Sequence, residues 1–454
     1  SDSTSLLSAL FSQAMAIALL TLPATLVFGA WFPMLNNYLT ESQGATAATL
    51  YGVNSIGACL GVLISGFLLV PWLGSAGTIS IAAGFLMLFS MVWLSTQMRV
   101  YFGLAAVVLL VLAIPVTQLP SAGELLPVTQ KNTRDLYQYE DAVSITHVIE
   151  RADGQRLLLG DLQRLDASSE PSAISSQLEQ ARLPLLLHPE PRSVLFLGIG
   201  TGISAAGSLG FPRLERTGVE LSRGAIIAAE KYFEPVNGGV MNKMSVIRDD
   251  ARRYLRRTEG RFDVIVGDLF HPDLVGRSAL LSVQQFRRVK ARLQSDGIFV
   301  QWLALQQFDQ RNLQVILRTF HHVFPKALLF VDGFKLALLG TVEDWNGARS
   351  VLRNMARLSS EVQQHVRGGE GNWTRLGRYV GSVQQHLISE TGAIQDEWRP
   401  YIEFSLPRLR YKDQSSLVNL LSALMDRRPK AADAAETLQV SNADYENFDR
   451  SYTA

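Results

Sequence analysis

The chain has 454 residues, with 42 lysines and arginines against 41 aspartates and glutamates, and a single cysteine. This length suits about three domains, the near-neutral charge argues against nucleic-acid binding, and one cysteine excludes a disulfide framework. The charges are unevenly distributed, because Glu41 is the only charged residue between Asp2 and Arg99. The composition therefore predicts an apolar membrane region followed by a charged, water-exposed region.

The first 120 residues contain four apolar runs, each near or above the ~20 residues that a membrane-spanning helix requires. We expect spans at Leu6–Met34, Ala45–Leu73, Ala76–Leu94 and Tyr101–Leu119. The second run carries a GxxxG step, Gly57 and Gly61, which is typical of a surface that another membrane helix approaches closely.

The orientation follows from the number of spans and the flanking charges. Four spans return the chain to the side from which it started, and Lys131 with Arg134 follows the last span. Because basic residues favour the cytoplasmic side, we expect the large domain in the cytoplasm.

Residues 142–165 alternate apolar or β-branched with polar side chains and contain Asp153-Gly154. Alternation with a period of two and an Asp-Gly pair predict a β-hairpin, so we expect a small antiparallel β subdomain. From about Pro184 to Thr341 the pattern changes to alternating strands and helices, which predicts a doubly wound α/β domain.

A glycine-rich turn lies inside the α/β region, where the apolar strand at Val194 runs into Gly198, Gly200 and Gly202. A dinucleotide fingerprint has its third glycine one position later, so this GxGxG spacing favours S-adenosylmethionine. The alternative is a turn that only tightens the connection between strand and helix.

Three carboxylates follow apolar runs after that turn, at Glu220, Asp250 and Asp268. The carboxyl ends of neighbouring parallel strands face one crevice, so these acids would meet a single ligand. Glu220 is about 20 residues beyond the turn, where a carboxylate binds ribose hydroxyls. The alternative for Glu220 is a solvated acid at a strand end.

After the α/β domain the sequence is typical of helices as far as Glu397, and a polar tail from about Arg427 is expected to be loosely held. We therefore expect a transmembrane region at 1–120, a β-hairpin subdomain at 121–168, a Rossmann-like α/β domain at 169–345 and a helical C-terminal extension and tail at 346–454.

These motifs together resemble the spermidine synthases, or polyamine aminopropyltransferases, and specifically the bacterial branch that is fused to a membrane region. The resemblance is carried by DGQRLLLGDLQ, VLFLGIGTG, VIRDDARRYL, FDVIVGDLFHP and RPYIEF, and by LYGVNSIGACLGVLISGFLLVPWLG in the membrane part. It implies a Rossmann-like transferase domain in a multi-pass protein of the bacterial inner membrane. Fused relatives have further helices before the point that corresponds to Ser1, so a processed, split or truncated start is expected.

The resemblance also implies the role of individual residues. Asp268 matches the catalytic aspartate, and Glu220 matches the acid that binds ribose. Asp250 and Ala251 match the pair that reads adenine, and Gln163 matches a glutamine beside the substrate channel. The cofactor would be decarboxylated S-adenosylmethionine or S-adenosylmethionine, held also by Gly198, Gly200, Thr201 and Gly202.

Three features of the sequence depart from the family pattern. Thr201 replaces an aspartate that grips the aminopropyl end of the cofactor, and His271 replaces a second substrate-binding aspartate. A Tyr-His-Glu triplet is replaced at residues 176–178 by Ser-Gln-Leu. Because a buried ammonium without a paired acid is costly, putrescine should bind poorly.

Two functions remain open from the sequence. The first is an aminopropyltransferase or methyltransferase with Asp268 as base and His271 as a proton relay, although His271 could instead only hydrogen-bond the backbone. The second is a subunit of a membrane complex that keeps the transferase fold for docking or nucleoside sensing. We expect the lipid bilayer, a membrane-protein partner and a homodimer as interactions, and no metal site or nucleic acid.

Overall fold

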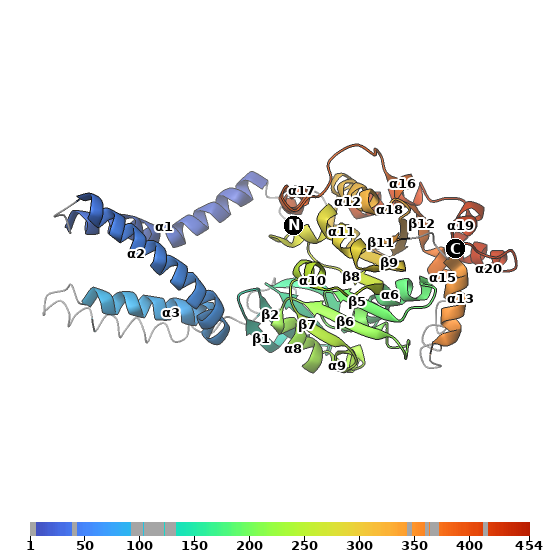
Figure 1. The fold of residues 1–454 in the computed structure, drawn as a ribbon, viewed down its shortest axis with the longest axis horizontal. Coiled ribbons are helices and arrows are strands. Elements are labelled where there is room, and N and C mark those ends of the chain that lie inside the picture. The colour runs from blue at the N-terminus through green and yellow to red at the C-terminus, as the bar shows by residue number, and fades with distance from the viewer. Residues whose placement is uncertain are drawn as a thin grey trace. The chain divides into compact units, whose positions relative to one another are not determined.

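The structure is a computed structural model that describes residues 6–38, 43–91, 133–342, 347–358, 372–411 and 416–454, together with the isolated positions 103, 122 and 363 (Figure 1). Its contacts divide the chain into two compact units. The first comprises residues 1–125 and 139–145, and the second comprises residues 126–138 and 146–454.

The first unit consists mainly of apolar helices. They are α1 (Leu6–Tyr38), α2 (Gln43–Ile64), a π-helical turn (Ser65–Leu69) and α3 (Val70–Met91). By length and composition, two stretches within them could cross a membrane, Leu10–Leu35 and Ala47–Met87. Large apolar side chains on these helices are exposed, as Leu20 and Trp72 illustrate at 82% and 83%.

The described parts of the second and third predicted spans follow one another directly, and the helix is interrupted between them at Gly74, where φ is 71°. The helix after the break begins at Ser75, whose backbone N–H donates to Glu140 Oε2 over 3.0 Å. This carboxylate satisfies one of the N–H groups that a new helix leaves without an intrahelical partner. The predicted fourth span, Tyr101–Leu119, lies outside the described residues.

A four-stranded sheet precedes the α/β domain, in the order β1-β2-β3-β4. Its strands are β1 (Thr133–Glu140), β2 (Ile145–Arg151), β3 (Arg156–Gly160) and β4 (Gln163–Ser168). Strands β2 and β3 are antiparallel, and the turn between them contains Gly154 with a φ of 80°. A positive φ favours glycine, so the Asp153-Gly154 signal and the antiparallel β subdomain are both confirmed.

The main sheet has eight strands in the order β12-β10-β11-β9-β8-β5-β6-β7. Strands β7, β6, β5, β8 and β9 are mutually parallel neighbours, whereas β11, β10 and β12 run antiparallel to their neighbours. This order places β5 between β6 and β8, in the middle of the five parallel strands. The strands are β5 (Ser193–Leu197), β6 (Glu215–Glu220), β7 (Ser245–Arg248), β8 (Phe262–Gly267), β9 (Leu293–Ala304), β10 (Leu328–Asp332), β11 (Lys335–Thr341) and β12 (Tyr379–Ser382).

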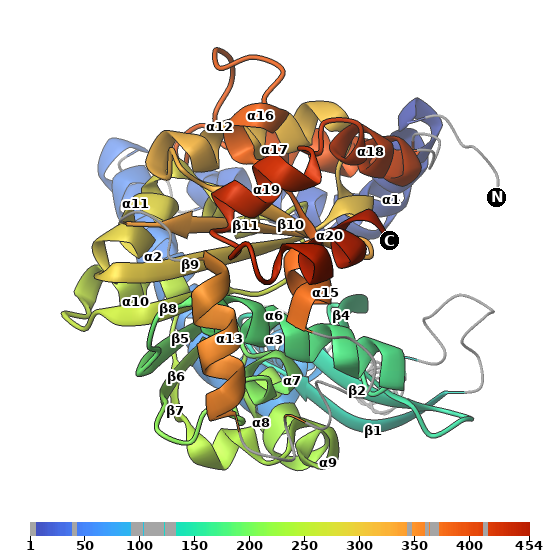
Figure 2. The ribbon, with the colours of Figure 1, turned by 90° about the vertical axis from the view of Figure 1, so that its right-hand side faces the viewer.

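Helices cover both faces of this sheet, with α6 on one side and α11 and α12 on the other (Figure 2). Alternate strand residues point to opposite faces, so Phe196 joins one core and Leu195 the other. The helices are α6 (Pro171–Leu187), α7 (Ile203–Ala206), α8 (Arg223–Lys231), α9 (Glu234–Asn237), α10 (Ala251–Arg257), α11 (Val283–Ala291), α12 (Gln310–Val323), α13 (Gly347–Arg357), α15 (Asn372–Gly377), α16 (Val383–His386), α17 (Tyr401–Ser405), α18 (Ser416–Met425), α19 (Ala431–Thr437) and α20 (Tyr445–Thr453). The doubly wound α/β class is confirmed.

The C-terminal segment differs from expectation in two respects. It supplies β12, an edge strand that pairs with β10, as well as helices. The expectation of a loosely held tail is wrong, because α19 and α20 bury Leu438, Phe448 and Tyr452 against the same core as α6. Apolar side chains at intervals within two short helices are enough to attach this mostly polar segment.

Candidate functional site

The glycine-rich turn connects β5 to α7 and has a backbone that requires glycine. The φ angles of Gly198, Gly200 and Gly202 are 96°, 55° and 78°, a region that other residues rarely adopt. A side chain at Gly198 would lie 3.9 Å from the Cβ of Asp268, and one at Gly202 would meet Asn237 at 3.0 Å. The spacing therefore reflects a tight turn packed directly against the end of β8.

Glu220 ends β6 and reaches over this turn. Its Oε2 accepts the backbone N–H groups of Ile199 and Gly200 over 2.9 and 3.2 Å, and its Oε1 accepts that of Ser222 over 2.9 Å. The side chain is half-buried. The structure thus brings the predicted ribose acid and the predicted glycine turn into direct contact.

Thr201 is buried within the turn. Its hydroxyl accepts the N–H of Ile203 over 3.4 Å, and its carbonyl accepts from Asn237 Nδ2 over 2.9 Å. These contacts hold the turn and the start of α7 together. The hydroxyl therefore has a local structural partner, in addition to the cofactor role that we predict for it.

Asp250 begins α10, with Ala251 as the first helical residue. Its Oδ1 accepts the N–H of Arg252 over 2.7 Å, and its Oδ2 pairs with the Arg252 guanidinium over 2.8 Å. Burial alone would raise the pKa of Asp250, but the hydrogen bonds and charge of Arg252 outweigh it and lower that pKa. The neighbouring Asp249 is more deeply buried and pairs with Arg253 and Arg257.

Asp268 follows β8 and is enclosed by polar groups. Its Oδ1 accepts the N–H of Leu269 over 2.8 Å, and Gln301 Nε2 donates to its backbone carbonyl over 3.4 Å. Burial raises the pKa of the Asp268 carboxyl, while hydrogen bonds from Leu269 and Ser204 and the charge of Lys335 oppose that rise. A carboxylate with a raised pKa is a better proton acceptor than a solvated one.

Two residues that the sequence analysis did not select complete the surroundings of Asp268. Gln180 on α6 is 1% exposed, and its side-chain amide is best assigned with its nitrogen toward Asp268 Oδ1 at 2.6 Å. The amide oxygen then accepts from Lys335 Nζ over 3.0 Å. Trp302 Nε1 donates to the Gln180 carbonyl over 3.0 Å and fixes this part of α6.

Lys335 lies on β11 and is only 3% exposed. One sequence signal could have identified it, since it is the only charged residue in the otherwise apolar run from Gly333 to Thr341. A lysine inside a buried strand is uncommon unless it has a partner. Its contact with Gln180 depends on a pairing across more than 150 positions, which the sequence pattern does not reveal.

His271 and Gln163 are placed differently from the other predicted residues. His271 Nδ1 lies 3.3 Å from Gln307 Nε2 and 3.7 Å from Asp273 Oδ1, in the loop that follows Asp268. Gln163 is on β4 of the small sheet, opposite Gly160. Within the described part of the chain, Gln163 makes no side-chain hydrogen bond to the turn or to Asp268.

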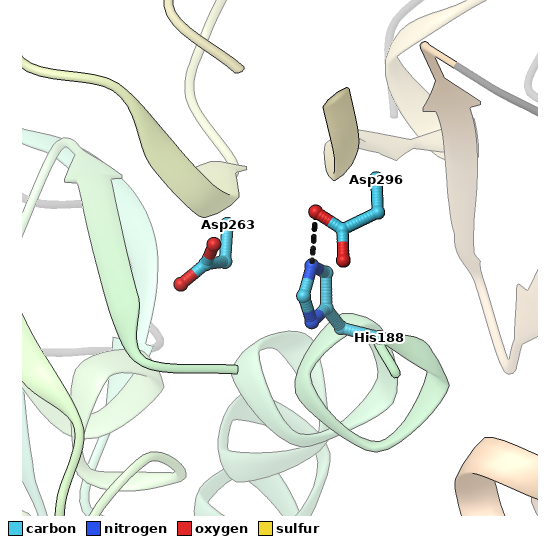
Figure 3. A group of neighbouring side chains, drawn as sticks. All are labelled: His188, Asp263 and Asp296. Atoms are coloured by element: carbon cyan, nitrogen blue, oxygen red, sulfur yellow. Dashed lines mark ion pairs between the residues drawn. The ribbon is translucent and has the colours of Figure 1, made fainter. Parts of the chain in front are cut away.

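A second cluster of ionisable groups, His188, Asp263 and Asp296, lies near the amino ends of β5, β8 and β9 (Figure 3). Their ligand atoms are within 4.8 Å of one another, with His188 Nε2 3.7 Å from Asp296 Oδ1. However, His188 Nδ1 accepts the N–H of Glu190 over 3.1 Å. The neutral ring then carries its proton on Nε2 and offers no lone pair there to a metal ion.

Comparison with known proteins identifies a family to which the α/β domain is similar. Residues 177–333 match the family model described as the spermine/spermidine synthase domain. Polyamine aminopropyltransferase 1 of Aquifex aeolicus is 30% identical over 201 residues, which cover 43% of this chain and 70% of that protein. The polyamine aminopropyltransferase of Corynebacterium efficiens is 30% identical over 303 residues, or 61% of this chain and 56% of that protein.

Among solved structures, the spermidine synthase of Thermotoga maritima is similar, with a TM-score of 0.40 and 18% identity over 52% of this chain and 79% of that one. Strand order and acids at the carboxyl ends of parallel strands define the fold class as a Rossmann-like α/β domain. The chain belongs to the spermine/spermidine synthase family. It spans about half the length of the curated relatives that it matches, at 56% and 54% of two of them.

Proposed function

We propose that this protein is a membrane-anchored transferase that binds an S-adenosyl sulfonium donor at the carboxyl edge of the main sheet. The observation that carries this proposal is the strand register. Leu197 of β5 is paired with Val219 of β6 and with Gly267 of β8. The residues that come directly after these three are Gly198, Glu220 and Asp268. The glycine turn, the proposed ribose acid and the proposed base therefore lie at the same level along one edge of the sheet.

The chain's own residues divide the work of binding. Glu220 accepts hydrogen bonds from ribose hydroxyls, which replace the hydrogen bonds from N–H groups of the turn. Asp250 with Ala251 binds the adenine. The three glycines let the nucleoside approach the backbone closely. Gln163, on the small sheet, borders the route of the acceptor.

The donor supplies an alkyl carbon bonded to a positively charged sulfur. The transferred group is aminopropyl in the family pattern, or methyl if the protein is a methyltransferase. The acceptor nitrogen forms a bond to that carbon while the carbon–sulfur bond breaks, and the electron pair leaves with the sulfur as a neutral thioether. Asp268 takes the proton that the nitrogen loses, and its raised pKa suits that step. His271, in the following loop, passes this proton onward.

The apolar helices support anchoring of the transferase in a bilayer. Lys131 and Arg134 after the predicted spans support a cytoplasmic position for the transferase domain, in a bacterial inner membrane. Among the described residues, no atom outside the local backbone of α2 lies within 4 Å of the Cβ positions of Gly57 and Gly61, which supports contact with a partner membrane subunit there. A homodimer is the other assembly that we propose to test.

A specific observation favours a second candidate, a docking or nucleoside-sensing domain without turnover. Asp250 already pairs with Arg252, and the Glu220 carboxylate is bound by its own turn. Both ligand acids therefore have intramolecular partners that a nucleoside must displace, which weakens binding.

The experiment that separates these functions uses the full chain, purified in detergent, with labelled S-adenosylmethionine and its decarboxylated form. Conversion of the decarboxylated donor to methylthioadenosine means aminopropyl transfer, and S-adenosylhomocysteine means methyl transfer. Binding without either product supports the sensing domain, and absence of binding contradicts both the transferase and the sensing domain and favours docking alone. Light scattering and analysis of co-purified subunits test the homodimer and the membrane partner.

A further inference from the structure

Three large apolar side chains are exposed on neighbouring segments of the second unit. Val275, Trp398 and Phe404 are 91%, 85% and 66% exposed. Val275 lies in the loop that follows Asp268, Trp398 lies in the loop before α17, and Phe404 is on α17. A single exposed apolar side chain is ordinary, but several together, with a tryptophan among them, are typical of a surface that contacts a partner.

Hydrogen bonds hold these segments together around the start of α11. Glu403 on α17 accepts the N–H of Gly276 over 3.1 Å, which joins α17 to the loop of the exposed valine. Arg288 on α11 donates to Glu397 Oε2 over 2.8 Å, directly before Trp398. The three apolar side chains are therefore carried by segments that are fixed to one another.

The basic helix α10 adjoins this part of the surface. Helices α10 and α11 are adjacent, and α10, α11 and α17 lie along one side of the second unit (Figure 1). The pKa of Arg252 on α10 is raised chiefly by its hydrogen bond to Asp250, and the charge of Glu397 contributes to that rise. Glu397 is thus close to α10, so the loop of Trp398 borders this helix.

These segments carry a surplus of positive charge after all their acids are counted. Residues 248–261 include six arginines and three acids, residues 283–292 include four basic residues and no acid, and residues 395–403 include one arginine and three acids. The net surplus is five positive charges. On α10, Arg253 and Arg257 pair with Asp249 but are still 62% and 63% exposed. Arg256 is exposed and forms no ion pair within the described part of the chain.

This combination of side chains suits the interface of a bilayer. Tryptophan and other apolar side chains enter the headgroup layer, while arginines bind lipid phosphates. The same chain has apolar helices that could cross a membrane. Residues 120–132, between the last predicted span and β1, reach at most about 45 Å when fully extended. A domain attached in this way stays within reach of the lipid surface.

We propose that the surface formed by Val275, Trp398, Phe404 and the arginines of α10 docks on anionic phospholipids of the bilayer. The three apolar side chains enter the headgroup layer, and the arginines bind the lipid phosphates. Val275 belongs to the loop that carries His271, so docking holds the candidate site close to the bilayer. The proposal requires no turnover and is independent of the proposed transferase function.

Fluorescence quenching by acrylamide, a neutral quencher dissolved in water, tests the proposal. The full chain with Cys59→Ala and Val275→Cys is labelled at position 275 and reconstituted in nanodiscs of phosphatidylcholine, with or without phosphatidylglycerol. Quenching should fall at least about twofold when the anionic lipid is present, and should recover in about 1 M salt, which screens the arginines. A label at Ala443→Cys, an exposed position beside α20 on the other side of the unit, should be quenched equally in both lipids (Figure 1).

Two sets of variants in the labelled chain identify the side chains responsible. Arg256→Gln with Arg399→Gln should remove at least about half of the protection by anionic lipid, and Trp398→Ser should do the same. Arg213→Gln with Arg349→Gln is the matched control, because it removes two exposed arginines outside these segments and should keep the full protection. Unchanged unfolding temperatures show that the variants are folded.

The outcomes that overturn the proposal are distinct. Equal quenching at position 275 in both lipids excludes docking on anionic headgroups. Equal loss of protection in the two double variants excludes a specific role for this surface. Protection in native membranes, but in neither kind of nanodisc, means that a protein covers the surface instead of lipid.

Discussion

Arg375 and Glu179 form a buried ion pair with two hydrogen bonds of 2.6 and 2.8 Å, although 196 positions separate them in the chain. Their side chains are 4% and 7% exposed. The pair connects α15 of the C-terminal segment to α6, one residue before Gln180. The C-terminal segment therefore supports the helix from which Gln180 reaches Asp268.

The first prediction concerns this pair. Arg375→Met leaves the buried Glu179 carboxylate with a hydrogen bond from Arg182 and the charge of Arg378, and removal of one member of a buried pair costs about 3–5 kcal/mol. Urea unfolding of the full chain in detergent should show this loss. Arg450→Met is the control, because Arg450 forms an exposed ion pair with Glu446, so its loss should cost at most about 1 kcal/mol. Equal losses of unfolding free energy in the two variants would contradict a stabilising role for the pair of Arg375 and Glu179.

The second prediction concerns acid stability. Burial alone would raise the pKa of Glu179, but the hydrogen bond and charge of Arg375, with the charge of Arg182, hold it below its usual value. A lowered pKa means that the pair stabilises the fold fully above the ordinary pKa near 4.5, and that this contribution is lost as pH falls through the lowered pKa. In a double variant, Glu179→Leu with Arg375→Met, the free energy of unfolding should depend less steeply on pH below about 4.5. An unchanged slope would exclude this linkage.

The parts of the site that were predictable from sequence depend on local signals. Gly198, Glu220 and Asp268 each follow an apolar strand, and parallel neighbouring strands necessarily bring such ends together. The position of Lys335 was not predictable in this way, because its contact with Gln180 is made between distant elements. The buried pair of Glu179 and Arg375 is likewise invisible as a pattern, since each residue alone resembles an ordinary charged position on a helix.

The C-terminal segment shows that sequence patterns are also limited in predicting the fold. Composition from Arg427 onward predicts a loosely held tail, because polar residues outnumber apolar ones. Phe448 and Tyr452 are nevertheless buried, since they are four positions apart on one face of α20. Two aromatic side chains bury enough area to hold a short helix against the core. The mean composition of the segment does not reveal such a helix.

The third prediction concerns Asp268. In Asp268→Asn the base is removed, and turnover should fall by about 10²–10⁴-fold while methylthioadenosine still binds. Burial raises the pKa of Asp268, so deprotonation of this carboxyl costs stability as pH rises from its ordinary value near 3.8 through the raised pKa. Because the asparagine does not titrate, the free energy of unfolding of the variant should depend less steeply on pH above about 3.8 than that of the wild type. An unchanged pH dependence would contradict this account.

The fourth prediction concerns Glu220. Glu220→Gln replaces an acceptor-only carboxylate with an amide, which serves both the turn N–H groups and ribose hydroxyls less well. Methylthioadenosine binding, followed by calorimetry, should weaken by at least about tenfold. Glu215→Gln is a control at the exposed opposite end of the same strand, β6, and should bind as the wild type does. Equal binding by both variants would remove Glu220 from the ligand site.

The fifth prediction concerns the membrane helices and uses Cys59, the only cysteine in the sequence. Cys59 lies on α2 and is exposed on the surface of the helix, so in a bilayer it would face lipid or another apolar helix. Water is excluded there and the reactive thiolate does not form, so a maleimide should label it in intact membranes only after sodium dodecyl sulfate is added. In a Cys59→Ala chain that also carries Ala443→Cys, the exposed new thiol should react with and without the detergent. Rapid labelling of Cys59 in untreated membranes would show that α2 contacts water and would contradict a membrane-spanning helix at this position.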